Sequence, residues 1–319
     1  RSQSQMECLN GLIKRLDPKK IGINVSRDHR SADGLSASLR DRLTEAIGPA
    51  YATRLVSAEK LAIGWIETRS PGELGMYRAI CGIAHDLIYE FFSNGVIIPD
   101  VTTTADISWW IWQRMIDIGV EPWFEPYITI QRHPGLAERY RENPEVVRRG
   151  DLLHCDIGLK YLRLCTDMQW HAYVLHIGET EAPAGLQKAL DNAVKLANLY
   201  MGEYKEGLSG HQIAANTLKK AESAGLRAQL YSHPIGFFGH SAGTSVDTRP
   251  VRSAPEEMSK VMEYPLHLNT CYAIEFSATS KVPEWNNADV VISYEENAAF
   301  TSEGCRFLDG NQTKLIIIR

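Results

Sequence analysis

Two aspartates lie eleven residues apart in CDIGLKYLRLCTDMQ, residues 155–169, a stretch otherwise made of apolar and strand-forming residues. Because side chains alternate along a strand, Asp156 and Asp167 can share one face if the segment folds back and the two pair across the ladder. The midpoint would fall at Tyr161-Leu162, which suits a two-residue turn poorly, so we expect a longer or bulged connection. Two carboxylates facing each other in an apolar sheet repel unless a cation lies between them. The stretch therefore predicts a hairpin that holds a metal ion or, in the alternative, leaves both aspartates in solvent.

Three later segments carry residues that could complete a metal site. SHPIGFFGHSAG contains His233 and His240, CYAIEFSA contains Glu275, and VVISYEENAAFTSEG contains Glu295 and Glu296. Each signal is weak alone, because a single glutamate in a strand is usually solvated and a histidine in a glycine-rich loop usually bonds within the loop. Their order, Asp, Asp, His, Glu, Glu, with each residue in a strand or at a loop edge, carries more information.

The composition narrows the function by exclusion. With 319 residues, 44% of them hydrophobic, the chain is long enough for about two domains and a sizeable core. The net charge of −5 contains no long run of one sign, which disfavours nucleic acid as a partner, and no apolar run approaches a membrane span. Six scattered cysteines form no CxxC pair, which argues against a zinc ribbon. There is no signal-peptide core, but the chain does not begin with Met, so the cytoplasm is favoured while the periplasm and secretion stay open.

The pattern of elements predicts an α+β protein. Residues 1–68 read as a helix–strand–helix fragment, and Ser70 with Glu73 predicts the capped start of a long helix that ends near Phe92. A threonine-capped helix follows, whose Trp109, Trp110 and Trp112 we interpret as packing residues rather than a platform for stacking bases. Strands and helices then interleave without a regular period, with helices over 183–206 and 209–225 and a strand-rich final third.

Taken together, the motifs resemble the pita-bread metallopeptidases, which include methionine aminopeptidase, aminopeptidase P, prolidase and the non-metal relative creatinase. The resemblance covers residues 69–319 and is closest to the Xaa-Pro aminopeptidase branch. It implies a pita-bread catalytic domain over 69–319, and it identifies residues 1–68 as the C-terminal remnant of a creatinase-type N-terminal domain. A short peptide substrate and a homodimer are also implied.

The resemblance implies a ligand set for two divalent metal ions, drawn from Mn, Co, Fe or Zn. Asp167 and Glu295 would bridge the two ions, which would share a water. The family's last ligand lies nine residues before a glycine, and Glu295 is preferred to Glu296 because it lies nine residues before Gly304. Glu275 would also move the proton of that water, and His240 would bind the substrate carbonyl. The full ligand set is Asp156, Asp167, His233, Glu275 and Glu295, and the further substrate contacts are His133 and His171.

The activity implied is that of an Xaa-Pro aminopeptidase or dipeptidase, although two positions depart from the prolyl-cleaving pattern. Gln229 stands where these relatives have a histidine, and residues 291–293, Val-Ile-Ser, stand where they have an arginine. These departures make the preference for proline less certain. Two other readings remain, a creatinase-like C–N hydrolase that needs no metal and a non-catalytic binding module on the same fold.

Overall fold

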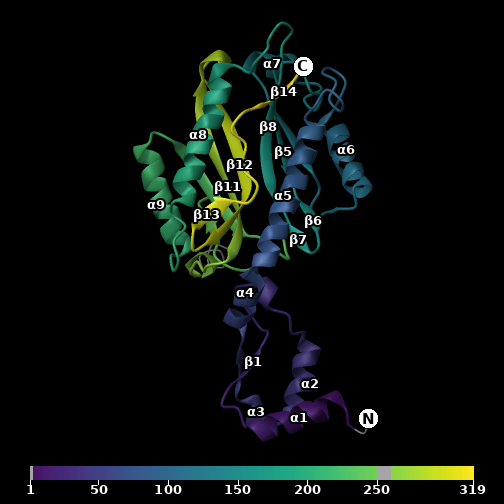
Figure 1. Ribbon diagram of the computed structural model, residues 1–319, viewed down its shortest axis with the longest axis vertical. Helices are drawn as coiled ribbons and strands as arrows, with labels where there is room; N and C mark the ends of the chain where they lie inside the picture. The colour runs from purple at the N-terminus through teal and green to yellow at the C-terminus, as the bar shows by residue number, and fades with distance from the viewer. Residues whose placement is uncertain (1–2, 250–259) are drawn as a thin grey trace. The chain divides into compact units, whose positions relative to one another are not determined.

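The computed structural model describes residues 3–249 and 260–319 (Figure 1). Contacts within the chain divide it into two compact units, Arg1–Ile66 and Glu67–Arg319. The domain roles assigned from the sequence, a remnant over 1–68 and a catalytic domain over 69–319, stay predictions. No helix in the described part of the chain is long and apolar enough to cross a membrane.

The first unit is a small fragment of mixed helix and strand. Ser4 begins its first helix through a capping box with Glu7. Its two short strands pair in parallel, with Ile21 opposite Leu55. The elements of this fragment are α1 (Gln5–Leu16), β1 (Ile21–Ile23), η1 (Arg30–Ala32), α2 (Ala37–Ile47), α3 (Pro49–Ala52) and β2 (Leu55–Ser57), followed by α4 (Glu59–Glu67).

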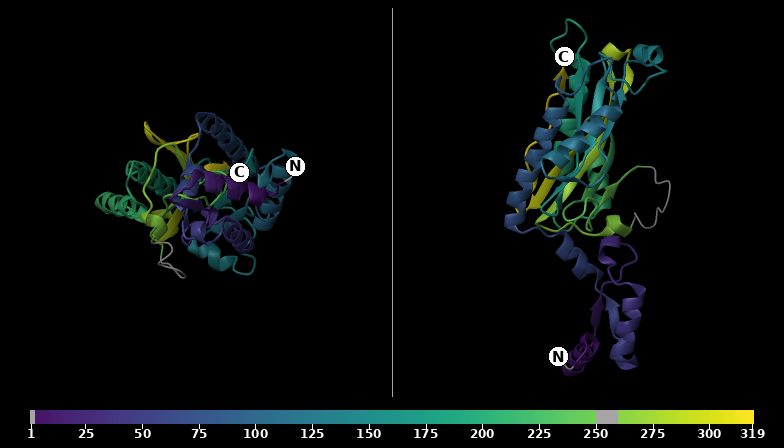
Figure 2. Two further views of the ribbon diagram at one scale, coloured as in Figure 1. Left: turned by 90° about the horizontal axis from the view of Figure 1, so that it is seen from below. Right: turned by 90° about the vertical axis from the view of Figure 1, so that its right-hand side faces the viewer.

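The second unit is built on a nine-stranded sheet in the order β10-β9-β11-β12-β8-β5-β4, with β13 added beside β12 and β14 beside β8. The long β11–β12 hairpin runs the length of this unit (Figure 2). The strands are β3 (Glu121–Pro122), β4 (Tyr127–Gln131), β5 (Leu152–Ile157), β6 (Leu159–Tyr161), β7 (Leu164–Cys165), β8 (Met168–Val174), β9 (Arg227–Pro234), β10 (Val246–Asp247), β11 (Thr270–Val282), β12 (Ala288–Thr301), β13 (Gly304–Phe307) and β14 (Ile316–Ile318).

The helices of this unit begin at the caps that the sequence indicates. Ser70 starts α5 with Pro71 at its first position and Glu73 completing a capping box, and Thr103 caps α6 in the same way. The helices are α5 (Pro71–Phe91), α6 (Thr104–Asp117), α7 (Pro134–Arg139), α8 (Ala184–Met201), α9 (Gly210–Ser223) and the short η2 (Pro283–Trp285).

Two hydrophobic cores lie mainly on the side of the sheet that the helices cover. On β11, the alternate residues Tyr272, Ile274 and Phe276 pack into the core that α8 and α9 share. On β5, Leu153 and Cys155 pack into the core formed by α5 and α6. Figure 1 shows the two helix pairs beside these two halves of the sheet. Because strand side chains alternate, the residues between these core positions project from the opposite face.

The hairpin of the two aspartates forms, but the expectation of a longer or bulged connection is wrong. Lys160 pairs with Cys165 and Tyr161 with Leu164, so only Leu162 and Arg163 remain in the turn. Both turn residues adopt positive φ, 50° and 68°, as a tight hairpin turn requires. The chain accepts this backbone conformation because pairing on both sides fixes the register.

That register also changes which residue faces the first aspartate. Asp156 lies opposite Gln169, not opposite Asp167 as predicted. The difference is two residues, and an even shift keeps a side chain on the same face of the sheet. Asp156 and Asp167 are therefore diagonal neighbours on one face, still within reach of a common ion.

The tryptophans of α6 only partly pack as predicted. Trp110 packs against the α5–α6 core. Trp109 is 72% exposed and Trp112 37% exposed, so the packing interpretation is wrong for Trp109. Both line a surface cavity of about 690 Å³ together with Trp123, Phe124 and Tyr127.

Candidate metal centre

Five neighbouring strands, or the residues next to them, supply the five ligand candidates. Asp156 lies on β5, Asp167 directly precedes β8, His233 lies on β9, Glu275 on β11 and Glu295 on β12. Glu275 pairs with Glu295 across one ladder, and Gln169 links Glu295 to Asp156 across the next two. The sheet register thus gathers residues that are up to 139 positions apart in the sequence.

The ligand atoms of these residues form overlapping groups. The imidazole Nε2 of His233 lies 3.4 Å from Asp167 Oδ2 and 3.7 Å from Glu295 Oε1. One group able to hold an ion contains Asp156, Asp167 and Glu295, and a second contains His233, Glu275 and Glu295, with the ligand atoms of each within 4.8 Å of one another. Glu295 belongs to both groups.

Three atoms of the cluster indicate whether a metal ion fits the site. Asp156 Oδ1, His233 Nε2 and Glu295 Oε1 are buried and make no hydrogen bond of good geometry within the described residues. Buried polar atoms are rarely left unpaired, because each loses its hydration without compensation. These atoms belong to the proposed ligands, and carboxylate and imidazole donors suit divalent transition metals. The residues present therefore fit a metal ion.

The electrostatics of the cluster lead to the same conclusion. Burial, and then the charge of Glu275, raises the pKa of Asp156 to about 7. Burial raises the pKa values of Asp167 and Glu295 well above their usual range, and neighbouring carboxylates add to the shift. Burial alone would lower the pKa of His233, but Glu295 and Glu275 outweigh it and raise the pKa. Without a cation, the cluster resists carrying its full negative charge.

His240 reaches the edge of this cluster from the loop after β9. Its ring lies edge-on to that of His233, with centroids 4.3 Å apart, and it can join His233 and Asp167 in a third group of potential ligands. Burial of part of the ring, with the charges of His233 and Arg249, lowers the pKa of His240 to about 4. Trp123 packs edge-on against the same ring at 5.4 Å. His240 is thus neutral near pH 7 and retains one N–H to donate.

The structure does not bring His133 or His171 into the cluster. His133 caps α7 and contacts Asn286 at the tip of the β11–β12 hairpin, where β11 ends seven residues, or roughly 23 Å, beyond Glu275. His171 is 1% exposed, and its Nε2 lies 2.8 Å from the carbonyl oxygen of Ser293. Neither ring belongs to a group of potential metal ligands among the described residues. Their role as substrate contacts stays a prediction without a contact to support it.

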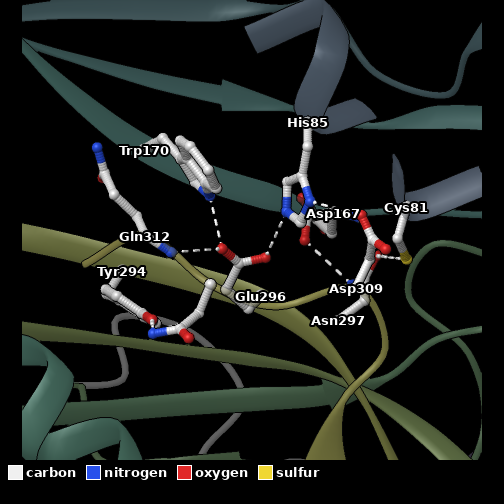
Figure 3. A network of polar contacts seen from close by, with 10 residues as sticks. Cys81, His85, Asp167, Trp170, Tyr294, Glu296, Asn297, Asp309 and Gln312 are labelled. Carbon is white, nitrogen blue, oxygen red and sulfur yellow. Dashed lines mark hydrogen bonds and ion pairs between the residues drawn. The ribbon is translucent and has the colours of Figure 1, made fainter. Parts of the chain in front are cut away.

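Glu296 lies on the opposite face of β12 from Glu295 and has its own partners (Figure 3). Its Oε2 lies 3.1 Å from His85 Nε2, and its Oε1 accepts hydrogen bonds from Trp170 Nε1 at 2.6 Å and from the backbone N–H of Gln312 at 3.3 Å. His85 is held on its other nitrogen by Asp309 at 3.1 Å. Glu296 is therefore satisfied on the helix-covered side of the sheet, away from the cluster.

Sequence reasoning missed two polar residues that contact the ligand candidates. Gln169 donates from Nε2 to Glu295 Oε2 at 2.7 Å. Asn297 bonds the main chain of Asp167 and is drawn in Figure 3. Each lies two residues after a ligand candidate, so the two-residue period of a strand would have placed both on the candidate's face. Nothing in the sequence itself marks these two uncharged residues as partners of the ligand candidates.

A curled sheet with helices on one side and an acidic, histidine-containing cluster on the other defines a metal-dependent hydrolase of the pita-bread class. A model of metallopeptidase family M24 matches residues 75–309. The chain belongs to this metal-dependent family, as the sequence predicted. Family membership supports a hydrolase that acts on peptides.

Solved structures show the same fold at low sequence identity. An X-Pro aminopeptidase from Thermotoga maritima matches 99% of this chain and 80% of its own, with 16% identity and a TM-score of 0.67. An Xaa-Pro dipeptidase from Bacillus anthracis matches 99% and 79%, with 17% identity and a TM-score of 0.64. A methionine aminopeptidase from Rickettsia prowazekii matches 76% and 99%, with 13% identity and a TM-score of 0.55. The pita-bread prediction is confirmed. No curated protein matches the sequence significantly.

Proposed function

We propose that the chain is a dinuclear-metal-dependent exopeptidase of the Xaa-Pro type, which hydrolyses a peptide bond near the N-terminus of short peptides. The convergence of four carboxylates and one imidazole on one face of the sheet carries this proposal, together with three ligand atoms that find no hydrogen-bond partner in the described part of the chain. Two overlapping groups of ligand atoms share Glu295, which supports two ions. Asp167 and Glu295 would each contribute to both ions. Asp156 would complete one ion's shell, and His233 with Glu275 the other.

The residues of the chain then have distinct tasks in hydrolysis. When bound, the ions supply an activated water and polarise the carbonyl of the scissile bond. The water oxygen bonds to the carbonyl carbon, and Glu275 carries the proton to the leaving nitrogen as the C–N bond breaks. His240, neutral and at the edge of the cluster, donates its N–H to the oxygen on which negative charge develops.

The row of side chains next to the metal row favours an aminopeptidase over a dipeptidase. Gln229, Ser277 and Ser293 lie opposite one another on β9, β11 and β12, two residues beyond the row that contains Glu275 and Glu295. Gln229 is exposed and the two serines are half-buried. Amides and hydroxyls pair with the main chain of a peptide but offer no charge to a free carboxylate. Arg249 is the cation whose charge reaches Glu275, and it is already paired with Asp247 at 2.8 Å. We therefore expect substrates whose chain continues past the cleaved bond.

Two other functions remain to be compared with this one. A creatinase-like C–N hydrolase would need no metal, and the complete ligand set argues against it. A non-catalytic module on this fold is a candidate because the chain also matches a FACT subunit SPT16 N-terminal domain from chickpea, over 98% of this chain and 74% of that one, with 11% identity and a TM-score of 0.56. The intact cluster of potential ligands disfavours that role.

The deciding experiment combines metal analysis with peptide hydrolysis. We expect two divalent ions per chain and cleavage of Xaa-Pro tripeptides that is lost on chelation and restored by Mn²⁺ or Co²⁺. Xaa-Ala tripeptides and Xaa-Pro dipeptides serve as matched substrates for the proline preference and for chain length. Activity indifferent to chelator would favour the creatinase-like reading, and binding of a protein without turnover would favour the module. Light scattering tests the homodimer.

Asp167→Ala gives a sharper test of the site. If Asp167 is shared between two ions, its loss should remove metal loading and activity together. The matched variant Asp191→Ala removes an exposed aspartate on α8 and should keep its metal. An Asp167→Ala chain that binds two ions and cleaves peptides normally would remove the bridging role.

A further inference from the structure

A directed chain of hydrogen bonds runs from the edge of the sheet to the metal cluster. Thr129 Oγ1 lies 3.0 Å from His154 Nδ1, and His154 Nε2 lies 2.9 Å from Gln169 Oε1. Gln169 Nε2 in turn donates to Glu295 Oε2 at 2.7 Å. The four residues belong to β4, β5, β8 and β12, which are consecutive neighbours in the sheet.

The ladder register places these four side chains in one line. Thr129 lies directly opposite His154, and Gln169 directly opposite Glu295. His154 and Gln169 are diagonal neighbours, because His154 faces His171 and Gln169 faces Asp156. His154 and Gln169 are 8% and 6% exposed, so the central bonds are shielded from water.

The direction of all three hydrogen bonds follows from the carboxylate of Glu295 at one end of the chain. An ionised Glu295, as a metal ligand must be, can only accept, so Gln169 presents its NH₂ to Glu295 and its carbonyl to His154. His154 must then carry its proton on Nε2, which leaves Nδ1 free to accept from the Thr129 hydroxyl. Every donor and acceptor along the line is used in a consistent order.

The chain has a geometric consequence for the ligand. Gln169 occupies Glu295 Oε2, while Glu295 Oε1 makes no hydrogen bond within the described residues and points toward His233. A carboxylate held on one oxygen cannot rotate freely about its terminal bond. Its other oxygen is thereby aimed at the centre of the cluster.

We propose that Thr129, His154 and Gln169 are positioning residues, which orient Glu295 for metal binding through this chain of hydrogen bonds. The inference rests on the proposed function, because it assumes that Glu295 binds an ion. Residues that hydrogen-bond metal ligands typically change metal affinity 10- to 100-fold when they are lost. The effect should weaken with distance along the chain.

The test uses the full-length chain, with Mn²⁺ as the probe in calorimetric titrations and the visible spectrum of bound Co²⁺ as a second readout. Gln169→Met removes the donor to Glu295 at similar volume, and we expect Mn²⁺ to bind about 10- to 100-fold more weakly. Thr129→Val removes only the remote hydroxyl, and we expect a loss of about fivefold, the effect of one ordinary hydrogen bond. Thr129→Ser keeps the hydroxyl and should restore wild-type affinity and the Co²⁺ spectrum.

The outcomes separate this inference from the proposed function. A wild-type chain that binds neither Mn²⁺ nor Co²⁺ overturns the proposed function and this inference with it. If the wild type binds metal and both Gln169→Met and Thr129→Val match it, the positioning role alone is overturned. Should Gln169→Met fail to fold, the comparison of Thr129→Val with Thr129→Ser still decides, because a loss common to both would contradict the hydroxyl's role.

Discussion

Asn297 holds Asp167 by its main chain, not by its carboxylate. The Asn297 side chain accepts a hydrogen bond from the backbone N–H of Asp167 at 3.1 Å and donates one to the carbonyl oxygen of the same residue at 3.0 Å. Asp167 directly precedes β8 and has no ladder partner of its own on β12. The amide of Asn297 therefore replaces the missing backbone pairing and leaves the carboxylate of Asp167 available for an ion.

Asn297→Ala should destabilise the metal-free chain by about 2–6 kcal/mol, because two buried backbone groups lose their partners at about 1–3 kcal/mol each. Urea unfolding in EDTA measures the change. Asn297→Asp keeps an acceptor for the N–H and should lie between the two. Asn198→Ala, an exposed position on α8, is the control and should change stability by less than about 0.5 kcal/mol. Equal effects of Asn297→Ala and Asn198→Ala would show that the hydrogen bonds from Asn297 to the main chain of Asp167 contribute nothing to stability.

The raised pKa values of the cluster predict how metal-free stability depends on pH. A carboxyl group whose pKa is raised on folding keeps its proton longer in the folded state, so stability falls as pH rises toward the folded pKa. Burial raises the pKa of Asp156 to about 7 and raises the pKa values of Asp167 and Glu295 well above their usual range. Burial lowers the pKa values of His154 and His171 to about 4 and about 3, which opposes the trend only below about pH 6.5, where an unfolded histidine is charged.

We therefore expect the free energy of unfolding in EDTA to fall as the pH rises toward and through about 7, the folded pKa of Asp156, by up to about 1.4 kcal/mol per pH unit for each carboxyl group still protonated. Saturating Mn²⁺ should remove this slope, because the ions replace the protons. Glu295→Gln, which removes one such group, should reduce it. Chemical denaturation at four pH values measures the slope, and a stability that rises over this range would contradict the charge balance assigned to the cluster.

The hairpin shows what the sequence could and could not predict about this site. The period of two along a strand placed Asp156 and Asp167 on one face, and an error of two residues in register left that conclusion intact. The turn itself was not predictable from residue preferences, because Leu162 and Arg163 are poor at positive φ. Cross-strand pairing of Lys160 with Cys165 overrides the local preference.

Replacing the turn residues should stabilise the protein. Leu162 and Arg163 have φ values of 50° and 68°, a conformation that costs an L-residue with a full side chain about 1–2 kcal/mol. Asn-Gly at these positions matches the turn, and we expect the free energy of unfolding to rise by about 1–2 kcal/mol, less the contact of the Arg163 guanidinium with the Phe237 ring at 5.5 Å. Arg163→Gly alone should give part of the gain. A clear loss of stability in the double variant would indicate a longer connection.

The histidines show a second limit of sequence reasoning. His233 and His240 come with a motif, and the structure brings both to the cluster. The family resemblance also implies His133 and His171 as substrate contacts, but their positions in the sequence specify neither the end of the strand that each approaches nor the burial of the ring. Long strands carry His133 to a hairpin tip, and His171 is covered by neighbouring residues. Gln169 and Asn297 could not be predicted, because an uncharged side chain gives no sign of its role until its hydrogen-bond partners are known.

His85 and Glu296 form a buried ion pair on the face of the sheet opposite the metal cluster. Glu296 is 1% exposed, and its Oε2 lies 3.1 Å from His85 Nε2. Removing one partner of a buried pair leaves the other charge without compensation, at a cost of about 3–5 kcal/mol. His85→Leu should therefore be strongly destabilising. Adding Glu296→Gln removes the buried unpaired charge while an amide oxygen can still accept from Trp170. The double variant should therefore recover the part of the loss that is due to Glu296, and the part due to Asp309, the second carboxylate on His85, should remain.

Urea unfolding of the wild type, both single variants and the double variant gives the coupling energy between the two residues. The control is the surface pair of Arg114 on α6 and Glu90 on α5, the helix that also carries His85. Arg114 Nε lies 2.9 Å from Glu90 Oε2, and the two side chains are 37% and 44% exposed. Arg114→Ala should cost less than about 1 kcal/mol, because water screens an exposed pair. If His85→Leu proves as mild as Arg114→Ala, or if Glu296→Gln fails to rescue it, then His85 stabilises the fold by packing and not by neutralising Glu296.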